Sequence, residues 1–279
     1  METLTDERIK ELKIIANNIR KSIIEMLLEA KSGHTAGSLG MADIFTLLYF
    51  HSLKHDPENP LWVNRDRLVL SNGHICPVLY ATMAHSGYFP KEELLRLRKF
   101  GSRLQGHPHR EYLPFIETSS GPLGSGLSQA VGIAIADKMY GETKTIYAIL
   151  SDGEHDEGNT WEAIMLANKE KLSNLIAIVD RNNIQIGGNT ERVMPLGDLK
   201  EKYKSFGWFE QEVDGHNFWE INNAIYKAKH HKGGPSVIIA HTVPSKGVKE
   251  WENDYKWHGK APNIVEAEKA LEELTNEKI

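Results

Sequence analysis

The chain has 279 residues and a formal charge of −5, and hydrophobic and charged residues make up 40% and 25% of it. These proportions are those of an ordinary globular protein that can bury a substantial core, so disordered and fibrous classes are excluded. The acidic balance lacks the broad basic surface that binding to nucleic acid requires, so nucleic acid is not an expected partner.

The cysteine content and the N-terminal residues indicate the cellular compartment of the protein. Cys76 is the single cysteine and cannot form an internal disulfide, which is typical of a reducing environment. The first residues, METLTDERIK, are charged, and no apolar stretch approaches the length of a membrane span. We therefore expect a cytoplasmic protein that has no membrane partner. Length and composition leave open whether the chain is a complete enzyme or half of a site shared with another chain.

Hydrophobic periodicity and turn residues divide the chain into helices and short apolar strands. Helices are expected over 7–30, 41–50, 75–85, 91–100, 127–140, 160–172, 218–231 and 263–277. Strands are expected over 67–70, 145–150, 175–180 and 236–240. Short apolar strands that alternate with helices are typical of parallel βαβ units. The predicted fold is an α/β domain over 1–279, with a mostly parallel central sheet flanked by helices, an N-terminal helix and a C-terminal helical tail.

Polar loops follow three of the expected strands, at 71–74, 151–158 and 180–188. Ligands of open parallel sheets bind outside the carboxyl ends of the strands, so these loops should converge. Asp152 follows one strand and Asn182 the next, and together they can face one Mg²⁺ ion that also takes phosphate oxygens. Gly153 would let a phosphate approach the backbone closely. Taken singly, both loops are also compatible with ordinary turn chemistry.

The loop Gly121-Pro-Leu-Gly-Ser-Gly126 opens the helix expected over 127–140. Its backbone N–H groups and the helix N-terminus suit an anion or a polar heterocycle. The dinucleotide-binding pattern is incomplete, because Gln129 occupies the position of its third glycine. A nicotinamide site is therefore not expected.

Four histidines lie next to glycines in expected loops: His34, His74, His107 and His258. Such loops can present an imidazole to a ligand, where it acts as a hydrogen-bond donor, an acid or a base. The alternative is that these side chains are solvated or cap carbonyl groups, which is the interpretation we favour for His51, His55, His85, His109, His230 and His231.

Other reactive groups favour a simpler interpretation. Glu154, Asp156 and Glu157 form a charge run that is expected to be mostly solvated. Cys76 is expected to be a small buried residue rather than a nucleophile, because no positive neighbour is evident that would lower its pKa.

Taken together, the motifs resemble the N-terminal, diphosphate-binding half of transketolase over residues 7–262. The motifs occur in the family's order: Lys31-Ser-Gly-His34, Asp66-Arg-Leu-Val-Leu-Ser-Asn-Gly-His74, Gly106-His-Pro108, Gly121-Pro-Leu-Gly124, Asp152-Gly153 with Asn182, and Asp214-Gly-His216. The resemblance implies thiamine diphosphate as cofactor, anchored by Mg²⁺ or by Ca²⁺ or Mn²⁺.

The resemblance also implies roles for individual residues. Metal ligands would be Asp152, Asn182 and the backbone carbonyl of Ile184. His74 and Gly153 would lie at the diphosphate, and Gly121 and Leu123 near the aminopyrimidine. Glu157 would lie at a subunit contact and communicate with the glutamate that activates the cofactor. His34, His107 and His258 would contact the hydroxyl groups of the donor sugar or the phosphate end of the cofactor.

Two departures from the family pattern affect these expectations. The segment Gly33-His-Thr-Ala-Gly-Ser-Leu-Gly40 lacks the family's prolines, so donor contacts there are less constrained, and Ser151 replaces a glycine before Asp152. The family's pyrimidine-binding domain does not follow in this chain.

The resemblance therefore predicts the N-terminal subunit of a split transketolase. A separately encoded C-terminal subunit would supply the pyrimidine side, with two copies of each chain and sugar phosphates as substrates. Two alternatives stay open: a related thiamine-dependent synthase acting on pyruvate or an unusual sugar, and a non-catalytic cofactor-binding subunit.

Overall fold

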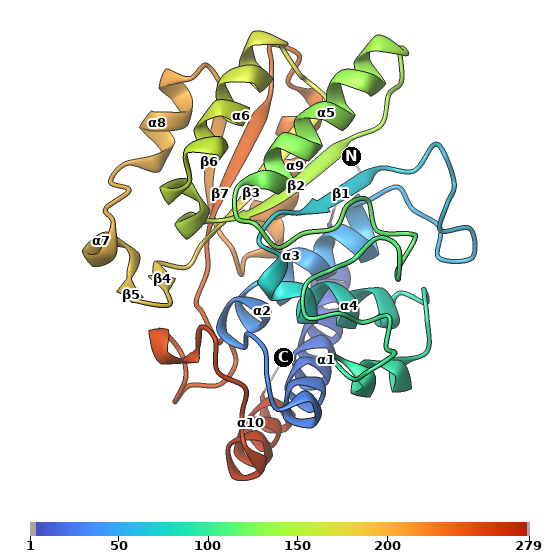
Figure 1. The fold of residues 1–279 in the computed structure, drawn as a ribbon, viewed down its shortest axis with the longest axis vertical. Coiled ribbons are helices and arrows are strands. Elements are labelled where there is room, and N and C mark those ends of the chain that lie inside the picture. The colour runs from blue at the N-terminus through green and yellow to red at the C-terminus, as the bar shows by residue number, and fades with distance from the viewer. Residues whose placement is uncertain (1–3, 278–279) are drawn as a thin grey trace.

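A computed structural model describes residues 4–277 and contains a central sheet of five parallel strands (Figure 1). The strands follow the order β1-β2-β3-β7-β6 across the sheet. Their bounds are β1 Arg67–Leu70, β2 Ile146–Ser151, β3 Leu175–Arg181, β7 Ser236–His241 and β6 Phe209–Asp214. The predicted α/β class and the parallel sheet are confirmed.

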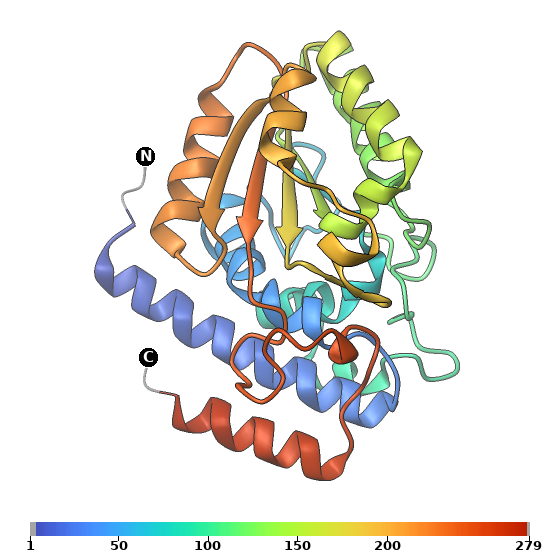
Figure 2. The same cartoon turned by 90° about the vertical axis from the view of Figure 1, so that its left-hand side faces the viewer.

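Helices cover both faces of this sheet (Figures 1 and 2). One face packs against α5 (Ser125–Met139), α6 (Gly158–Lys169) and α8 (Leu199–Ser205), and the other lies over α3 (Ala42–Leu47), α4 (Cys76–His85) and α9 (Phe218–His230). Successive side chains of a strand point to opposite faces. In β3, Ile176 and Ile178 join one core, whereas Ala177 and Val179 join the other. This explains why the central strands are apolar throughout.

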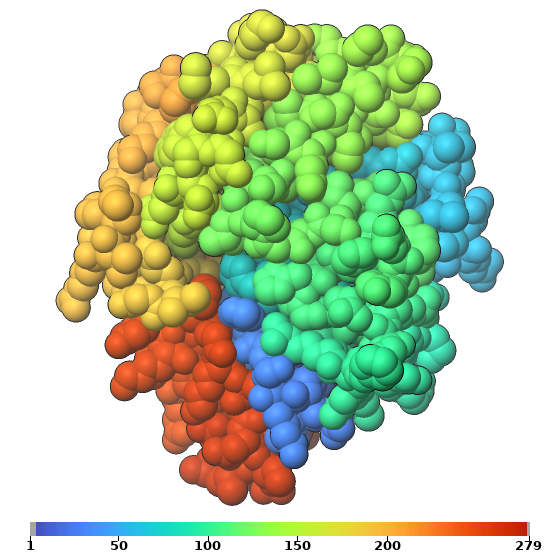
Figure 3. Space-filling model, viewed as in Figure 1, coloured from blue at the N-terminus to red at the C-terminus, as the bar shows by residue number. Residues whose placement is uncertain are grey.

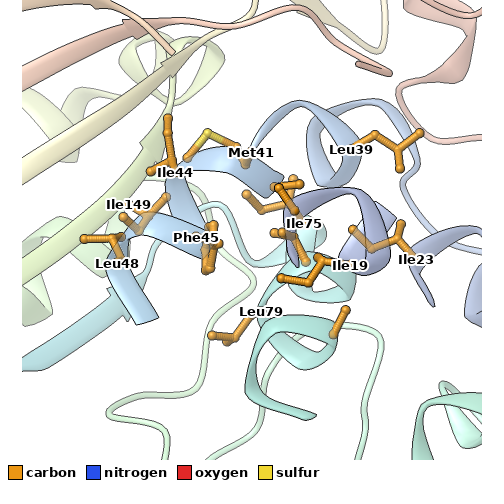
Figure 4. Close-up of a cluster of buried hydrophobic side chains, with 14 of the residues drawn as sticks. Ile19, Ile23, Leu39, Met41, Ile44, Phe45, Leu48, Ile75, Leu79 and Ile149 are labelled. Carbon is orange, nitrogen blue, oxygen red and sulfur yellow. The ribbon is translucent and has the colours of Figure 1, made fainter. Parts of the chain in front are cut away.

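The long helix α1 (Asp6–Ala30) and the C-terminal helix α10 (Ile264–Asn276) lie side by side (Figure 2). The side chain of Asn17 donates from Nδ2 to the carbonyl of Leu274 at 2.9 Å and links the two helices. Ile19 and Ile23 of α1 join Phe45 and Leu79 in the core drawn in Figure 4. Both of these helices, which the periodicity predicted, therefore pack on the same hydrophobic core.

Several local predictions were wrong or incomplete. The segment 41–50 is not one helix, because α3 passes into a π-helical turn over Leu48–Ser52. Lys91–Arg96 forms a 3₁₀ turn, where a longer helix was expected over 91–100. The edge strand β6 was missed, since its sequence FEQEVD is polar and mostly only half-buried.

Short elements complete the chain. They are α2 (Ala36–Gly40), the hairpin strands β4 (Ile184–Gln185) and β5 (Gly188–Asn189), α7 (Thr190–Val193), and 3₁₀ turns at Gly73–Ile75, Asp152–Asp156 and Tyr255–Trp257. Within residues 4–277, no helix combines the length and the apolar character needed to cross a bilayer.

Candidate functional site

Three strand ends converge at one pocket, as the sequence predicted. β1, β2 and β3 are neighbours in the sheet, and all three point the same way. A cavity of about 300 Å³ lies beyond their carboxyl ends. Its lining combines the strand-end loops with distant segments: His34, His74, His107, Gly121, Leu123, Ser151, Gly153, Asn182, Ile184, Gln185, Ile186 and His258. In Figure 3 the yellow β4–β5 region, the red C-terminal segment and the blue-to-green N-terminal part meet on the face turned to the viewer.

The four glycine-flanked histidines form one cluster within this lining. The ring centroid of His34 lies 5.1 Å from that of His74, 5.6 Å from that of His258 and 6.4 Å from that of His107. His74 and His258 are 5.2 Å apart. The structure gives none of these rings a hydrogen bond to any residue that it describes, and the buried Nδ1 of His34 is unpartnered. Their polar nitrogens are therefore available to a ligand.

Partial burial keeps these imidazoles neutral. The pKa of His34 falls to about 4, because the ring is largely withdrawn from water and lies near His258, Arg98 and His107. The pKa of His74 is also well below its usual value, chiefly because the ring is withdrawn from water, and the same cause lowers the pKa values of His107 and His258. A neutral imidazole keeps one ring nitrogen that can accept a proton.

Hydrogen bonds hold the histidine-bearing segments together. The hydroxyl of Thr35, next to His34, donates to the carbonyl of Lys260 at 2.6 Å. The backbone N–H of Ser245 donates to the carbonyl of Ala36 at 2.9 Å. These bonds fix the segment that carries His258 against the start of α2.

Asp152 is fully buried at the end of β2, and its carboxylate already has partners. Oδ2 accepts hydrogen bonds from the N–H of Asn183 at 2.8 Å and from Nη1 of Arg181 at 3.2 Å, and Oδ1 accepts one from the N–H of Gly153 at 2.8 Å. Burial raises the pKa of Asp152 to about 6, and Arg181 opposes the shift. A bound cation would relieve this cost of burying the charge. Arg181 is a neighbour that sequence reasoning had not singled out.

Asn182 lines the pocket from the end of β3. Its Oδ1 accepts from the N–H of Ile184 at 3.0 Å, and its Nδ2 donates to Oδ2 of Asp180 at 2.7 Å. The other oxygen of Asp180 accepts from the hydroxyl of Thr242. Burial raises the pKa of Asp180 to about 7. Asp180 and the N–H of Ile184 thus fix the orientation of the Asn182 amide, with Nδ2 toward Asp180 and Oδ1 toward Ile184.

The glycines leave room for a ligand close to the backbone. A Cβ at Gly121 would meet no atom within 4 Å, and one at Gly153 would meet only Cβ of Gln185 at 3.8 Å. The open glycines, the unpartnered imidazole nitrogens and the carboxylate and amide oxygens match what a diphosphate with a divalent ion requires. The residues therefore fit such a cofactor. No three His, Cys, Asp or Glu side chains between residues 4 and 277 form a metal site of their own.

The acidic run after Asp152 divides into two kinds of residue. Asp156 and Glu157 are exposed, as expected, and Glu157 lies outside the pocket lining. Glu154 contradicts the expectation of a solvated side chain, because it is completely buried. The signal was present in the sequence: Ser151 followed by a glutamate three residues later is a capping box, and both of its hydrogen bonds form.

Cys76 is buried, and desolvation raises the pKa of its thiol to about 12. The thiolate is therefore not formed near neutral pH, which agrees with the prediction of a small buried residue rather than a nucleophile.

Similarity to known proteins shows the family of this chain. The model for "Transketolase, thiamine diphosphate binding domain" matches residues 11–275. The "6-deoxy-6-sulfo-D-fructose transketolase subunit SqwG" of Clostridium sp. (strain MSTE9) is 45% identical over 237 residues, which are 85% of this chain and 86% of that protein. A protein of Phocaeicola vulgatus, named as one subunit of an apulose-4-phosphate transketolase, is 37% identical over 268 residues, which are 96% of this chain and 95% of that protein.

A solved structure agrees with both. The transketolase of Campylobacter jejuni superposes with a TM-score of 0.90 at 38% identity, and the match covers 95% of this chain and 43% of that one. Fold, pocket lining and sequence similarity agree, and this chain belongs to the transketolase family, in which it corresponds to the thiamine diphosphate binding domain.

Proposed function

We propose that this chain is the N-terminal subunit of a transketolase whose active site it shares with a separately encoded C-terminal subunit. The reaction is transfer of a two-carbon ketol unit from a ketose phosphate to an aldose phosphate. The observation that carries the proposal is the meeting of His34, His74, His107 and His258 with the strand-end loops of Asp152 and Asn182 at one pocket. Relatives of nearly the same length are named as subunits, which supports a second chain.

Thiamine diphosphate, when bound, supplies an electron sink for cleavage of a carbon–carbon bond. Asp152, Asn182 and the carbonyl of Ile184 would hold Mg²⁺, or Ca²⁺ or Mn²⁺. His74 and Gly153 would lie at the diphosphate. Gly121 and Leu123 would lie near the aminopyrimidine.

The remaining histidines would accept and return protons of the donor's hydroxyl groups. His34, His107 and His258 are held with lowered pKa values, so they are neutral near pH 7 and can accept a hydroxyl proton as the donor's carbon–carbon bond breaks. The same rings can return a proton when the acceptor adds. The withdrawal of the rings from water supports this role, since a charged imidazole could not act as a base.

The exposed Glu157 would lie at the contact with the partner, where it would communicate with the glutamate that activates the cofactor. Two copies of each chain would form the active assembly. The protein would be cytoplasmic, because a single cysteine is typical of a reducing compartment.

The test is reconstitution with the product of a neighbouring reading frame that resembles the pyrimidine-binding half. The purified chain alone should show no ketol transfer, and activity should appear when the companion, thiamine diphosphate and Mg²⁺ are added. Full activity of the isolated chain would overturn the shared site. Cofactor binding to the complex without any transfer reaction would favour a non-catalytic subunit instead.

A second candidate is the same chemistry with an unusual sugar as donor. One relative is named for 6-deoxy-6-sulfo-D-fructose and another for apulose-4-phosphate, so the names of the relatives give different sugars. A panel of ketose phosphates, a sulfonated ketose and pyruvate, assayed with one acceptor, separates these possibilities by kcat/KM. Preference for pyruvate would instead indicate a related synthase.

A further inference from the structure

The buried carboxylate of Glu154 joins three segments of the pocket. Oε1 accepts a hydrogen bond from the hydroxyl of Ser71 at 2.6 Å and another from the backbone N–H of Gly124 at 2.7 Å. Oε2 accepts from the backbone N–H of Ser151 at 2.9 Å. These donors come from the loop after β1, the start of α5 and the end of β2. One side chain therefore links three elements that are far apart in the sequence.

Each of the three segments carries a residue of the pocket lining. Ser71 precedes His74, Gly124 follows Leu123, and Ser151 precedes Gly153. Glu154 itself is absent from the lining and is shielded from solvent. It therefore acts on a ligand only through the residues that it holds.

The chemistry of the contacts suits an ionised carboxylate. All three partners are donors, and an ionised carboxylate is purely an acceptor. Within residues 4–277, no Lys, Arg or His forms an ion pair with Glu154, so its carboxylate is held by these hydrogen-bond donors. Removal of the carboxylate would leave two backbone N–H groups and one hydroxyl buried without a partner, which is costly.

The segments around Glu154 are packed tightly against one another. A Cβ at Gly126 would lie 2.5 Å from Cα of Ser71, so α5 and the end of β1 are in direct backbone contact. Gly124 has φ of +77° and a Cβ there would lie 2.1 Å from Oδ1 of Asn159. The backbone of Glu154 is fixed as well, because its carbonyl accepts from the hydroxyl of Thr160 at 2.6 Å. Close backbone contacts and hydrogen bonds therefore hold the three segments around the carboxylate.

We propose that Glu154 is the positioning residue that sets the mutual placement of the loops bearing His74, Leu123 and Gly153, and that it thereby determines cofactor affinity without touching the cofactor. This rests on the proposed function, in which those loops bind thiamine diphosphate. The role is distinct from that of Glu157, which is exposed and has no hydrogen bond to any of the three segments.

The first experiment measures hydrogen exchange of the chain without cofactor, in wild type, Glu154→Gln and Glu154→Ala. The amides of Gly124 and Ser151 should be protected in wild type and should exchange at least ~10-fold faster in Glu154→Ala, with Glu154→Gln between them, because the amide keeps a single acceptor oxygen. The control Trp208→Phe removes a buried bond to the carbonyl of Ile164, which involves none of the three segments, and should leave these two amides protected. Unchanged or uniformly faster exchange in the Glu154 variants would overturn the proposal.

The second experiment measures binding of thiamine diphosphate with Mg²⁺ to the two-chain complex by calorimetry. Cofactor affinity should fall about 10- to 100-fold in Glu154→Ala, whereas kcat at saturating cofactor should fall much less. Asp156→Asn, two positions along and exposed, should bind as wild type does. Equal affinities in Glu154→Ala and Asp156→Asn would contradict the positioning role. Failure of wild type to bind would contradict the proposed function, and the exchange experiment would still test the loops.

Discussion

Two groups of polar side chains, an acidic side in and behind the wall of the pocket and a histidine side in its lining, are held differently by the chain. On the acidic side (Asp152, Glu154, Asp180 and Asn182) every carboxylate and amide group is buried and has a hydrogen-bond partner within the chain. On the histidine side (His34, His74, His107 and His258) the rings crowd together and stay partly accessible, and the described part of the chain offers them no hydrogen bond. The two sides therefore differ in whether their polar atoms are already satisfied.

This difference indicates a division of labour. The acidic side is held by donors of the chain before any ligand arrives, which is what anchoring a cofactor in one orientation requires. The histidine side keeps its ring nitrogens for ligands: His74 for the diphosphate, and His34, His107 and His258 for the groups that change during the reaction. Variants on the acidic side and at His74 should therefore alter cofactor affinity, and variants of His34, His107 and His258 should alter turnover.

The largest effect is expected for Asp152→Asn. The substitution keeps the shape of the side chain, but it removes the negative charge that would hold the cation. Affinity for thiamine diphosphate with Mg²⁺, measured by calorimetry on the two-chain complex, should fall about 100-fold or more, beyond the effect of a residue that only positions a ligand. The melting temperature of the chain should fall as well, because the amide keeps one acceptor oxygen where the carboxylate has two, and it loses the charge that pairs with Arg181. Wild-type affinity in this variant would remove Asp152 from the metal site.

The next effect is expected for His107→Ala. Here kcat/KM for a hydroxylated donor should fall about 100-fold, the usual contribution of a positioned acid or base, while cofactor affinity stays within a few fold. A donor without the hydroxyl group, such as pyruvate, should lose far less. An equal loss for both donors would show that His107 does not act on the donor's hydroxyl group.

Strands and site residues could be predicted from the sequence where a local sequence pattern marks them. The apolar strands β2 and β3 and the glycine-flanked histidines are visible as patterns, so the sheet and the pocket lining were predictable. The edge strand β6 was not, because only one of its six residues is fully buried and its alternation is weak. Edge strands lack the second apolar face that makes central strands conspicuous.

The partners of the site residues were harder to predict than the residues themselves. Glu154 is marked by a capping box with Ser151, but nothing in the sequence indicates that Ser71 and Gly124 meet the same carboxylate. Asp180 likewise looks like a strand-end turn residue, and only the register of β3 beside β7 places Thr242 against it. Such contacts depend on tertiary packing.

A smaller effect concerns the pH dependence of stability. The folded chain keeps the pKa of His34 near 4, whereas the unfolded chain takes up the proton near 6.5. The stability contributed by the neutral ring is thus complete above pH 6.5 and is lost as the pH falls toward about 4. The difference in the free energy of unfolding between wild type and His34→Asn should therefore decrease as the pH is lowered from 6.5 to about 4, as measured by urea denaturation. A flat difference would contradict a neutral ring in the folded chain.

His85 provides the matched control for this measurement. Its pKa also falls to about 4, and its Nε2 lies 3.0 Å from the hydroxyl of Ser22, away from the pocket. His85→Asn should reproduce the direction of the stability change but leave kcat/KM unaffected, whereas His34→Asn should change both.

The smallest effect is expected for Arg98→Gln, which tests the electrostatics of the histidine side. The guanidinium of Arg98 bridges two histidine-bearing loops, with Nη1 donating to the hydroxyl of Ser32 and Nη2 to the carbonyl of Gly106, both at 3.3 Å. Its charge contributes to the lowered pKa values of His34 and His107.

Removal of this charge should move both pKa values upward, and an NMR titration of the histidine ring protons would measure the shift. The exposed neighbour Lys99 binds the carbonyl of Glu29, so Lys99→Gln should leave both rings unchanged. Because burial is the larger cause of both shifts, the pKa values should remain below 6.5 even without Arg98. Titration of His34 at 6.5 in the variant would mean that Arg98, rather than burial, keeps this ring neutral.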